Sequence, residues 1–274
     1  MPSSWHLLQS GPGDSAFNMA LDEALLQSAA RLGQPVLRFY SWTEPAASFG
    51  YFQKYAGIEQ MTPLRPLVRR PTGGGLVAHD ADWTYSLVFP PGHDWYSLTA
   101  TDSYRRMHEW IQAAFARLNL ATELAPGCRK TRPGQCFQGH EMFDLLWRGQ
   151  KIAGAAQRRT RDGLLIQGSV QLSPLPMNLN SPEIGRRFPL SPSEGERAGV
   201  RGPPLSWDSG AQNASKCRGV LSLARADWQQ AMCDVACSGQ AAQWVKFEPD
   251  APLAEQTQAL VRQKYSQPSY NQKR

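Results

Sequence analysis

The stretch Val68-Arg69-Arg70-Pro71-Thr72-Gly73-Gly74-Gly75-Leu76-Val77-Ala78-His79-Asp80 decides how the rest of the chain is interpreted. Three consecutive glycines add no side chain to a core, but they let a ligand approach the main chain closely. The run at 84–89 predicts a β-strand, so the glycines lie in the loop before it. We expect the loop amides, with Arg69 or Arg70 beside them, to bind a carbonyl group or an anion. A mobile hinge beside a solvated arginine pair is the alternative.

The composition indicates a globular protein with acidic partners. The chain has 274 residues, 41% of them hydrophobic, which suffices for one large domain or two small ones. The net charge is +6, but the basic residues are scattered. The densest basic points, Arg158-Arg159 and the 129–132 region, do not form the tail typical of a nucleic-acid-binding protein. We expect acidic protein surfaces as partners, and neither nucleic acid nor a membrane.

The N-terminus and the cysteines predict the location of the protein. Residues 1–6 lack the basic start and the apolar run of a signal peptide, and no segment is apolar enough to span a bilayer. The five cysteines form no paired framework, which is typical of free thiols in a reducing cytoplasm. Cys233 and Cys237 lie one helical turn apart without a further ligand at suitable spacing. We therefore expect no metal site, and burial of both thiols as small apolar groups.

The N-terminal segment predicts an amphipathic helix. Asp14 is a suitable N-cap, apolar residues recur on one face, and Gly33 closes the helix. Asn18, Asp22 and Glu23 lie off the apolar stripe. Because polar residues at such positions are typically solvated, we expect these three to face water.

The remaining pattern predicts an α+β fold with a mixed, largely antiparallel β-sheet flanked by helices. Asp162-Gly163 is a strong hairpin signal. Repeated prolines and polar turn residues at 173–217 predict a disordered insertion, so we expect a single domain made of 1–172 and 218–274. The expected strands are 36–42, 46–53, 84–89, 143–147, 151–157 and 164–172, and the later expected helices are 97–118, 221–237 and 253–265.

Two further stretches carry candidate chemical groups. Cys136 follows a glycine in the loop Gly134-Gln135-Cys136-Phe137, and Lys151 opens the strand Lys151-Ile152-Ala153-Gly154-Ala155-Ala156-Gln157. The small residues after Lys151 leave room beside it, which a solvated strand would not need. Inert burial is the alternative for Cys136, and a plain surface position is the alternative for Lys151. Cys128 is a weaker nucleophile candidate, and His140 is a candidate base for Cys136.

The stretches at 69–80 and 151–157, in this order and at this separation, resemble the lipoate-protein ligase A and octanoyltransferase family of the biotin/lipoyl ligase superfamily. The resemblance runs from about residue 4 to residue 172 and resumes in the final helix. It implies a catalytic domain similar to class II aminoacyl-tRNA synthetases and biotin-lipoyl ligases, with a tunnel for an octanoyl chain. It also implies protein lipoylation: an acyl amide on a lysine of the lipoyl domains of 2-oxoacid dehydrogenases or of the glycine cleavage H protein.

The family has two branches, and the sequence resembles one of them more closely. One branch activates free lipoate with ATP and Mg²⁺. The other takes octanoate from acyl carrier protein, in one form through a cysteine thioester. Cys136 ahead of the lysine hairpin, and Pro71-Thr72 where many ligases have Arg-Ser, favour the cysteine-dependent transferase. Gly75, often arginine in transferases, keeps the ATP-dependent ligase as an alternative, and the insertion keeps a non-catalytic lipoyl-domain binder or decayed homologue as another.

The resemblance also assigns roles to individual residues. Cys136 would accept the acyl group as nucleophile, and Lys151 would donate a hydrogen bond to the acyl carbonyl as charge develops on its oxygen. The transferase would need no cofactor. We expect a cytoplasmic monomer whose partners are acyl carrier protein and the lipoyl domains or H protein. The candidate substrate-binding residues are Arg69, Arg70, Gly73, Gly74, Gly75, Val77, His79 as a pocket-shaping residue, Ala153, Gly154, Gly168 and Ser169.

Overall fold

The computed structural model describes residues 4–130, 139–171, 223–240 and 243–273. These residues belong to one unit formed by 1–174 and 223–274. Cys136 and the predicted insertion at 173–217 lie outside the described residues. The domain boundaries expected from the sequence therefore stay a prediction.

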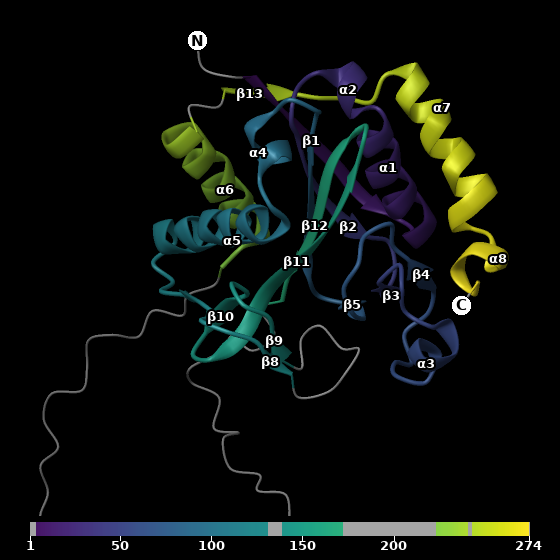
Figure 1. The fold of residues 1–274 in the computed structure, drawn as a ribbon, viewed down its shortest axis with the longest axis horizontal. Helices are drawn as coiled ribbons and strands as arrows, with labels where there is room; N and C mark the ends of the chain where they lie inside the picture. Colours follow the sequence, from purple (N-terminus) through teal and green to yellow (C-terminus); the bar gives the residue numbers. More distant parts are fainter. Residues whose placement is uncertain (1–3, 131–138, 172–222, 241–242, 274) are drawn as a thin grey trace, which may run out of the picture. The chain divides into compact units, whose positions relative to one another are not determined.

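A mixed β-sheet forms the centre of this unit (Figure 1). Among the described residues it has eight strands in the order β13-β1-β2-β6-β12-β11-β10-β7. β1 (Ser4–Gly13) pairs in parallel with β2 (Val36–Trp42) and with β13 (Gln243–Lys246). The remaining pairs are antiparallel and join β2 to β6 (Trp83–Phe89), β12 (Gly163–Val170), β11 (Gln150–Thr160), β10 (Leu145–Trp147) and β7 (Glu123–Leu124) in turn. The predicted fold class is confirmed.

Helices cover both faces of the sheet, because successive strand residues point to opposite sides. On one face, α1 (Ser15–Gln27) and α7 (Ala251–Leu260) pack where Val36 and Leu165 form a core with Leu25. On the other face lie α5 (Ala100–Arg117) and α6 (Arg225–Gln240), and the ring of Phe39 meets that of Trp228. Figure 1 shows the two helix pairs on opposite sides of β2 and β12.

The first helix begins where the sequence predicts. The carboxylate of Asp14 caps α1 by accepting a hydrogen bond of 2.7 Å from the amide of Phe17. The helical stretch is interrupted at Ser28 and continues as α2 (Ala29–Leu32), which Gly33 closes with a φ of 68°. This left-handed conformation is one that glycine adopts without strain.

The expectation that Asn18, Asp22 and Glu23 face water is wrong. All three are buried, with exposed fractions of 0%, 0% and 4%. Their partners come from distant parts of the chain: Arg38 contacts Asn18 and Asp22, and Lys264 contacts Glu23. Periodicity within one helix cannot show these contacts, since it carries no information about what packs against the helix.

A small second sheet carries the glycine-rich loop. Its order is β4 (Leu67–Arg69), β3 (Ala46–Phe49) and β5 (Val77–His79). β3 is shorter than the predicted 46–53, because the chain turns at Gly50 and the amide of Gln53 donates to the carbonyl of Gly50. A Cβ on Gly50 would lie 1.9 Å from the carbonyl oxygen of Gly74. The loop therefore packs directly on the backbone of Gly50.

Seven of the described strands were not predicted, among them β1 and β13 of the large sheet, and other boundaries moved. β1 lacks a clear apolar alternation, and β13 lies in the link that the sequence analysis treated only as an anchor between two helices. The hairpin turn consists of Arg161 and Asp162, with Gly163 already paired to Thr160. The last predicted helix ends at Leu260 and continues as the short π-helix η1 (Val261–Tyr265). The minor elements are α3 (Tyr55–Glu59), α4 (Asp94–Ser97), α8 (Pro268–Asn271), β8 (Arg129–Lys130) and β9 (Gly139–His140).

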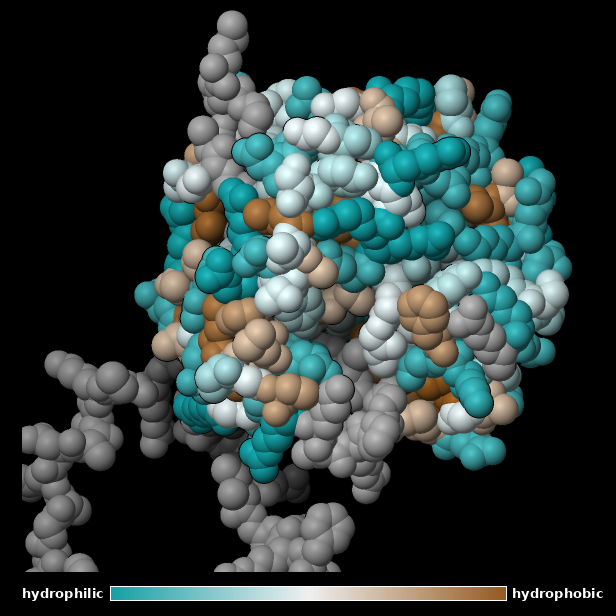
Figure 2. All heavy atoms as spheres, in the orientation of Figure 1, coloured by the Kyte–Doolittle hydropathy of each residue, from teal (hydrophilic) through white to brown (hydrophobic). Residues whose placement is uncertain are grey.

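The surface and the cysteines complete the fold. Figure 2 shows one face, on which hydrophilic residues predominate and apolar residues gather only in small separate groups. Within the described ranges, no helix is both long and apolar enough to cross a membrane, and no three potential ligand side chains are grouped as a metal site. Cys233 is buried, which raises the pKa of its thiol to about 12, whereas Cys237 is exposed and the expectation of its burial is wrong.

Candidate functional site

A pocket lies between the large sheet, the small sheet and α1. Seven of the candidate residues line it: Arg70, Val77, His79, Lys151, Gly154, Gly168 and Ser169. Arg69, Gly73, Gly74, Gly75 and Ala153 are not in its lining, and Cys136 lies outside the described residues. Residues that the sequence analysis did not select complete the described lining: Met19, Tyr40, Ser48, Thr84, Ala155, Ala156 and Gln167.

Small residues on β11 and β12 create the space. Gly154, Ala155 and Ala156 of β11 lie in the pocket wall, whereas Ala153, which the sequence analysis also chose, does not. Ala153 is fully buried and pairs with Val170. Gly168 is required by close packing, because a Cβ there would lie 2.1 Å from Cζ of Tyr85. Larger side chains at these positions would fill the pocket or disrupt the sheet.

Lys151 places a cation in the pocket wall. Its Nζ lies 2.8 Å from Oδ2 of Asp144, and both side chains are buried, with exposed fractions of 6% and 0%. The lysine side chain lies over Gly154, where a Cβ would come within 2.5 Å of Cε and 2.6 Å of Nζ. The glycine therefore provides the surface on which the ammonium group rests.

Asp144 is itself held by two groups. The hydroxyl of Tyr104 donates to Oδ1, and the amide of Glu141 donates to Oδ2 at 2.6 Å. Burial, together with the neighbouring carboxylate of Asp144, raises the pKa of Tyr104 well above its usual value. The sequence analysis missed both residues. The available signal was an acidic residue directly before the strand that pairs with the lysine strand.

Arg70 binds the glycine-rich loop from within. Its guanidinium donates to the carbonyls of Gly73 and Gly75, at 2.6 and 2.7 Å, and to the carbonyl of Ser48 at 3.2 Å. Gly74 has a φ of 85°, which favours glycine, and its carbonyl lies against Gly50. Arg70 thus fixes the loop conformation and also lines the pocket.

Arg69 points away from the pocket. It is fully buried, and its guanidinium donates to the carbonyls of Tyr51, Gln53 and Asn271 at 2.7–3.0 Å. Its backbone amide also donates to the Asn271 side chain at 2.9 Å. These contacts attach the C-terminal helix α8 to β4, which is a structural position rather than a place in the pocket lining.

A polar cluster centred on Asp82 forms another part of the wall. The His79 ring is hydrogen-bonded to Ser48 Oγ through Nε2 and to Asp82 Oδ2 through Nδ1, both at 2.8 Å. The hydroxyls of Thr84 and Ser169 also donate to Asp82, at 3.0 and 2.7 Å. Burial alone would raise the pKa of Asp82, but the charge of His79 and these hydrogen bonds outweigh it and lower the pKa.

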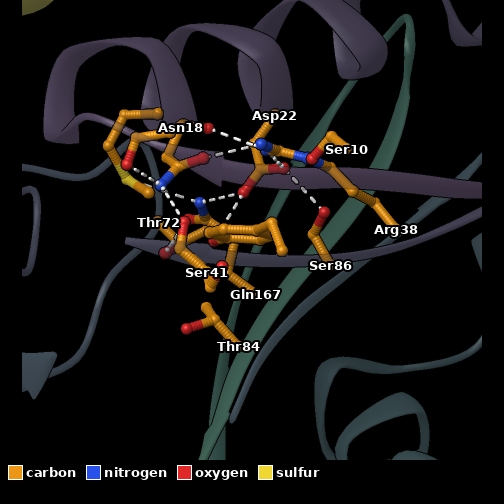
Figure 3. Close-up of polar contacts among 12 residues, drawn as sticks. Ser10, Asn18, Asp22, Arg38, Ser41, Thr72, Thr84, Ser86 and Gln167 are labelled. Carbon is orange, nitrogen blue, oxygen red and sulfur yellow. Dashed lines mark hydrogen bonds and ion pairs between the residues drawn. The ribbon is translucent and has the colours of Figure 1, made fainter. Parts of the chain in front are cut away.

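A second network, centred on Asp22, supports the pocket from the α1 side (Figure 3). Asp22 forms a buried ion pair of 2.7 Å with Arg38 and accepts a hydrogen bond of 3.1 Å from the hydroxyl of Tyr40. Gln167 donates to Asp22 at 2.7 Å and accepts from the hydroxyl of Thr72 at 2.7 Å. Figure 3 shows the side chains of α1, β2 and β12 converging on this carboxylate.

The two networks provide hydrogen-bond partners for polar side chains in the described pocket wall. Tyr40 and Gln167 are bonded to Asp22, while Thr84 and Ser169 are bonded to Asp82. The polar side chains of the described lining thus have hydrogen-bond partners within the protein, so the free surface that they offer is largely their carbon skeleton. The arrangement suits an apolar group that carries one polar atom near Lys151.

The segment containing Cys136 is bordered by paired strands. β8 and β9, at 129–130 and 139–140, pair on either side of it. The Nδ1 of His140 lies 2.9 Å from the carbonyl of Gly127, and since a carbonyl only accepts, Nδ1 donates this hydrogen bond. The role of His140 as a base for Cys136 stays a prediction, as does the weaker candidacy of Cys128, which is exposed.

Comparisons with known proteins agree with the motifs. Residues 14–180 match the family model of the lipoyl protein ligase A/B catalytic domain. The octanoyltransferase LipM of Oceanobacillus iheyensis is 38% identical in an alignment 180 positions long, which covers 63% of this chain and 66% of the relative. The alignment thus covers slightly less than two thirds of that relative.

Solved structures share the fold at lower sequence identity. A lipoate-protein ligase A bound with ATP has a TM-score of 0.67 and 20% identity, with 99% of each chain covered. A bi-partite lipoate protein ligase of Thermoplasma acidophilum, analysed with its E2 lipoyl domain, has a TM-score of 0.63 and 20% identity, with 99% of this chain and 97% of that chain covered. The resemblance drawn from 69–80 and 151–157 is confirmed: the chain belongs to the lipoyl protein ligase A/B catalytic domain family.

Proposed function

We propose that this protein is a protein-lipoylation enzyme that transfers an octanoyl or lipoyl group from acyl carrier protein to a lysine of a lipoyl domain or of the glycine cleavage H protein. The observation that carries the proposal is the pocket itself, whose described polar groups are bonded internally and whose wall contains the ammonium group of Lys151. Two proteins similar to this chain, from Oceanobacillus iheyensis and Bacillus subtilis, are both named octanoyltransferase LipM. They support the choice of an octanoyl group.

The acyl chain supplies binding energy by leaving water. Each buried methylene contributes about 0.8 kcal/mol, so the methylenes of an octanoyl chain contribute roughly 5 kcal/mol when fully buried. The Gly154, Ala155 and Ala156 wall and the aliphatic parts of Met19 and Val77 offer the apolar surface for this chain.

The chemistry needs two acyl transfers and no cofactor. In the first, the thiolate of Cys136 attacks the thioester carbonyl of the donor, a new C–S bond forms, and the carrier thiol leaves. In the second, the lysine amine of the acceptor attacks the Cys136 thioester, an amide forms, and the amine loses a proton as the thiolate is released. The first exchange is nearly isoenergetic, whereas amide formation is strongly downhill.

Lys151 would act on the carbonyl oxygen in both steps. Negative charge develops on that oxygen as each tetrahedral intermediate forms, and the Lys151 ammonium would donate a hydrogen bond to it. A preorganised donor of this kind accounts for roughly 10²–10³ in rate. The glycine-rich loop, held by Arg70, forms the neighbouring wall and limits how the carbonyl can lie.

Mass spectrometry of the intact protein tests this function. After incubation with octanoyl-acyl carrier protein, we expect an octanoyl adduct on Cys136 that disappears when a lipoyl domain is added. Cys136→Ser should form no adduct, and Cys128→Ser serves as the matched control that still does. Acylation of the lipoyl domain that requires ATP and free lipoate would instead identify a ligase. Absence of both reactions in a folded protein would identify a non-catalytic binder.

The remaining expectations form part of the same proposal. We infer a cytoplasmic monomer with acyl carrier protein and a lipoyl domain or H protein as successive partners. The E2 lipoyl domain analysed with the Thermoplasma acidophilum ligase supports the second partner. We also retain the single catalytic domain formed by residues 1–172 and 218–274.

A further inference from the structure

The carboxylate of Asp144 is engaged on both oxygens. Oδ1 accepts a hydrogen bond from the hydroxyl of Tyr104, and Oδ2 accepts from the amide of Glu141 at 2.6 Å and lies 2.8 Å from Lys151 Nζ. With two donors besides the lysine, the carboxylate has little rotational freedom. The lysine head group therefore has a fixed anion on one side and Gly154 beneath it.

The backbone around Asp144 is also fixed. Its amide donates to the carbonyl of Glu141 at 3.1 Å, and its carbonyl accepts from the amide of Ala125 at 2.8 Å. Phe143, just before it, has a φ of 70°, a left-handed conformation that is strained for a bulky residue. Strain of this kind persists only where the surroundings impose it, and it gathers at sites where geometry matters.

Tyr104 is held equally firmly on α5. The His108 ring lies 4.3 Å from the Tyr104 ring between centroids, and its Nδ1 is 2.9 Å from the carbonyl of Tyr104. Complete burial lowers the pKa of His108 to about 4, so the imidazole is neutral and does not compete with Lys151 for the charge of Asp144. The contacts with His108 on the same helix thus hold the tyrosine hydroxyl in a fixed position.

A comparison with another buried ion pair, Arg38 with Asp22, separates positioning from simple stabilisation. Arg38 pairs with Asp22, but its guanidinium also donates to Ser10 and Asn18, and it does not line the pocket. Lys151 does line the pocket. We propose that Asp144 and Tyr104 are positioning residues for the acyl transfer described above, with Tyr104 fixing Asp144 and Asp144 fixing the Lys151 ammonium toward the acyl carbonyl.

The inference rests on the proposed function and predicts an ordered series of effects on octanoyl transfer. Asp144→Asn should lower kcat about 100-fold and Tyr104→Phe about 10-fold, with KM for octanoyl-acyl carrier protein changing less than about 3-fold. Because Tyr104 acts through Asp144, adding Tyr104→Phe to Asp144→Asn should lower kcat no further. Multiplying effects, or a loss confined to KM, would overturn the proposal.

Tyr265→Phe is the matched control. Tyr265 is buried, and its hydroxyl also donates to a carboxylate, that of Glu23 at 2.7 Å, but the lysine paired with this carboxylate, Lys264, does not line the pocket. Loss of a tyrosine–carboxylate hydrogen bond as such would therefore affect both variants in thermal stability. We expect only Tyr104→Phe to lose transfer activity, and an equal loss in Tyr265→Phe would contradict a positioning role.

The chemical reactivity of Lys151 tests this inference separately from the proposed function. Trace labelling with acetic anhydride, followed by peptide mass spectrometry, gives the reactivity of Lys151 relative to the exposed Lys54. We expect Asp144→Asn to raise this ratio at least about 3-fold and Tyr104→Phe to raise it less, because a lysine that is no longer held against the carboxylate is more accessible to the reagent. An unchanged ratio in Asp144→Asn overturns the positioning role. Wild-type protein that transfers no acyl group, with the ratio shifted as expected, contradicts only the proposed function.

Discussion

The ammonium group of Lys151 rests on the α-carbon of Gly154, so closely that a methyl group at position 154 would lie 2.6 Å from Nζ. Such a methyl meets the far end of the flexible Lys151 side chain and, at 3.2 Å, Oδ1 of Asp144. A substitution at position 154 should therefore affect catalysis more than folding, which makes it a useful test.

Gly154→Ala should displace Lys151 without unfolding the protein. We expect kcat for octanoyl transfer to fall about 100-fold, because the donor to the acyl carbonyl leaves its place. The free energy of unfolding should change by less than about 1 kcal/mol, as a flexible side chain can move aside. Gly239→Ala is the control, since a Cβ there meets nothing within 4 Å and the residue lies in α6. Full activity in Gly154→Ala would contradict the placement of Lys151.

Gly168→Ala should destabilise the fold, in contrast to Gly154→Ala. The added methyl would lie 2.1 Å from Cζ of Tyr85, whose ring is fully buried and cannot move aside cheaply. We expect the free energy of unfolding to fall by about 1–3 kcal/mol, measured by urea denaturation. Gly127→Ala, where a Cβ has no neighbour within 4 Å, should remain close to wild type. A wild-type denaturation midpoint for Gly168→Ala would show that Tyr85 is not packed against the strand.

Burial of His108 should make stability depend on pH. Burial lowers the folded-state pKa to about 4, whereas the unfolded chain titrates near 6.5. Between these values the unfolded state binds the extra proton, so stability is lost as the pH falls from 6.5 to 4, by about 3 kcal/mol from this residue. His108→Phe removes that contribution. The unfolding free energy of the wild type, minus that of the variant, should therefore fall as the pH is lowered from 6.5 to 4. A difference that stays constant with pH would contradict a buried neutral imidazole.

The Asp22 carboxylate should be costly to neutralise. Asp22→Asn leaves Arg38 buried without its counter-charge, and we expect the free energy of unfolding to fall by roughly 3–5 kcal/mol. Gln167 and Thr72 would also lose their fixed orientation. Glu248→Gln, which removes an exposed partner of Lys246, is the control and should show no measurable change. Equal effects from the two substitutions would contradict the network in Figure 3.

Local sequence predicted the parts of this protein whose cause is local. The cap at Asp14, the helix end at Gly33 and the strand at 36–42 each follow from a few neighbouring residues. The small residues after Lys151 likewise indicated a space beside the strand. These residues, together with the family resemblance, predicted a space beside Lys151, and the roles assigned to the residues around it stay predictions.

Long-range partners could not be predicted in the same way. Asp22 is buried because Arg38, Tyr40 and Gln167 approach it from other strands, and no periodicity in α1 indicates that. Tyr104 lies in the helix predicted at 97–118, but its hydrogen bond to Asp144 depends on how that helix crosses the sheet. Such contacts are properties of packing, which a single sequence does not specify directly.

The account depends most on an acyl chain lying in this pocket with its carbonyl against Lys151. The most direct test is a crystal structure of the protein after reaction with octanoyl-acyl carrier protein. The account predicts the alkyl chain between Val77 and Gly154, with the carbonyl oxygen about 2.7–3.1 Å from Lys151 Nζ. An octanoyl group bound elsewhere, with this pocket closed and Lys151 distant from the carbonyl, would contradict it.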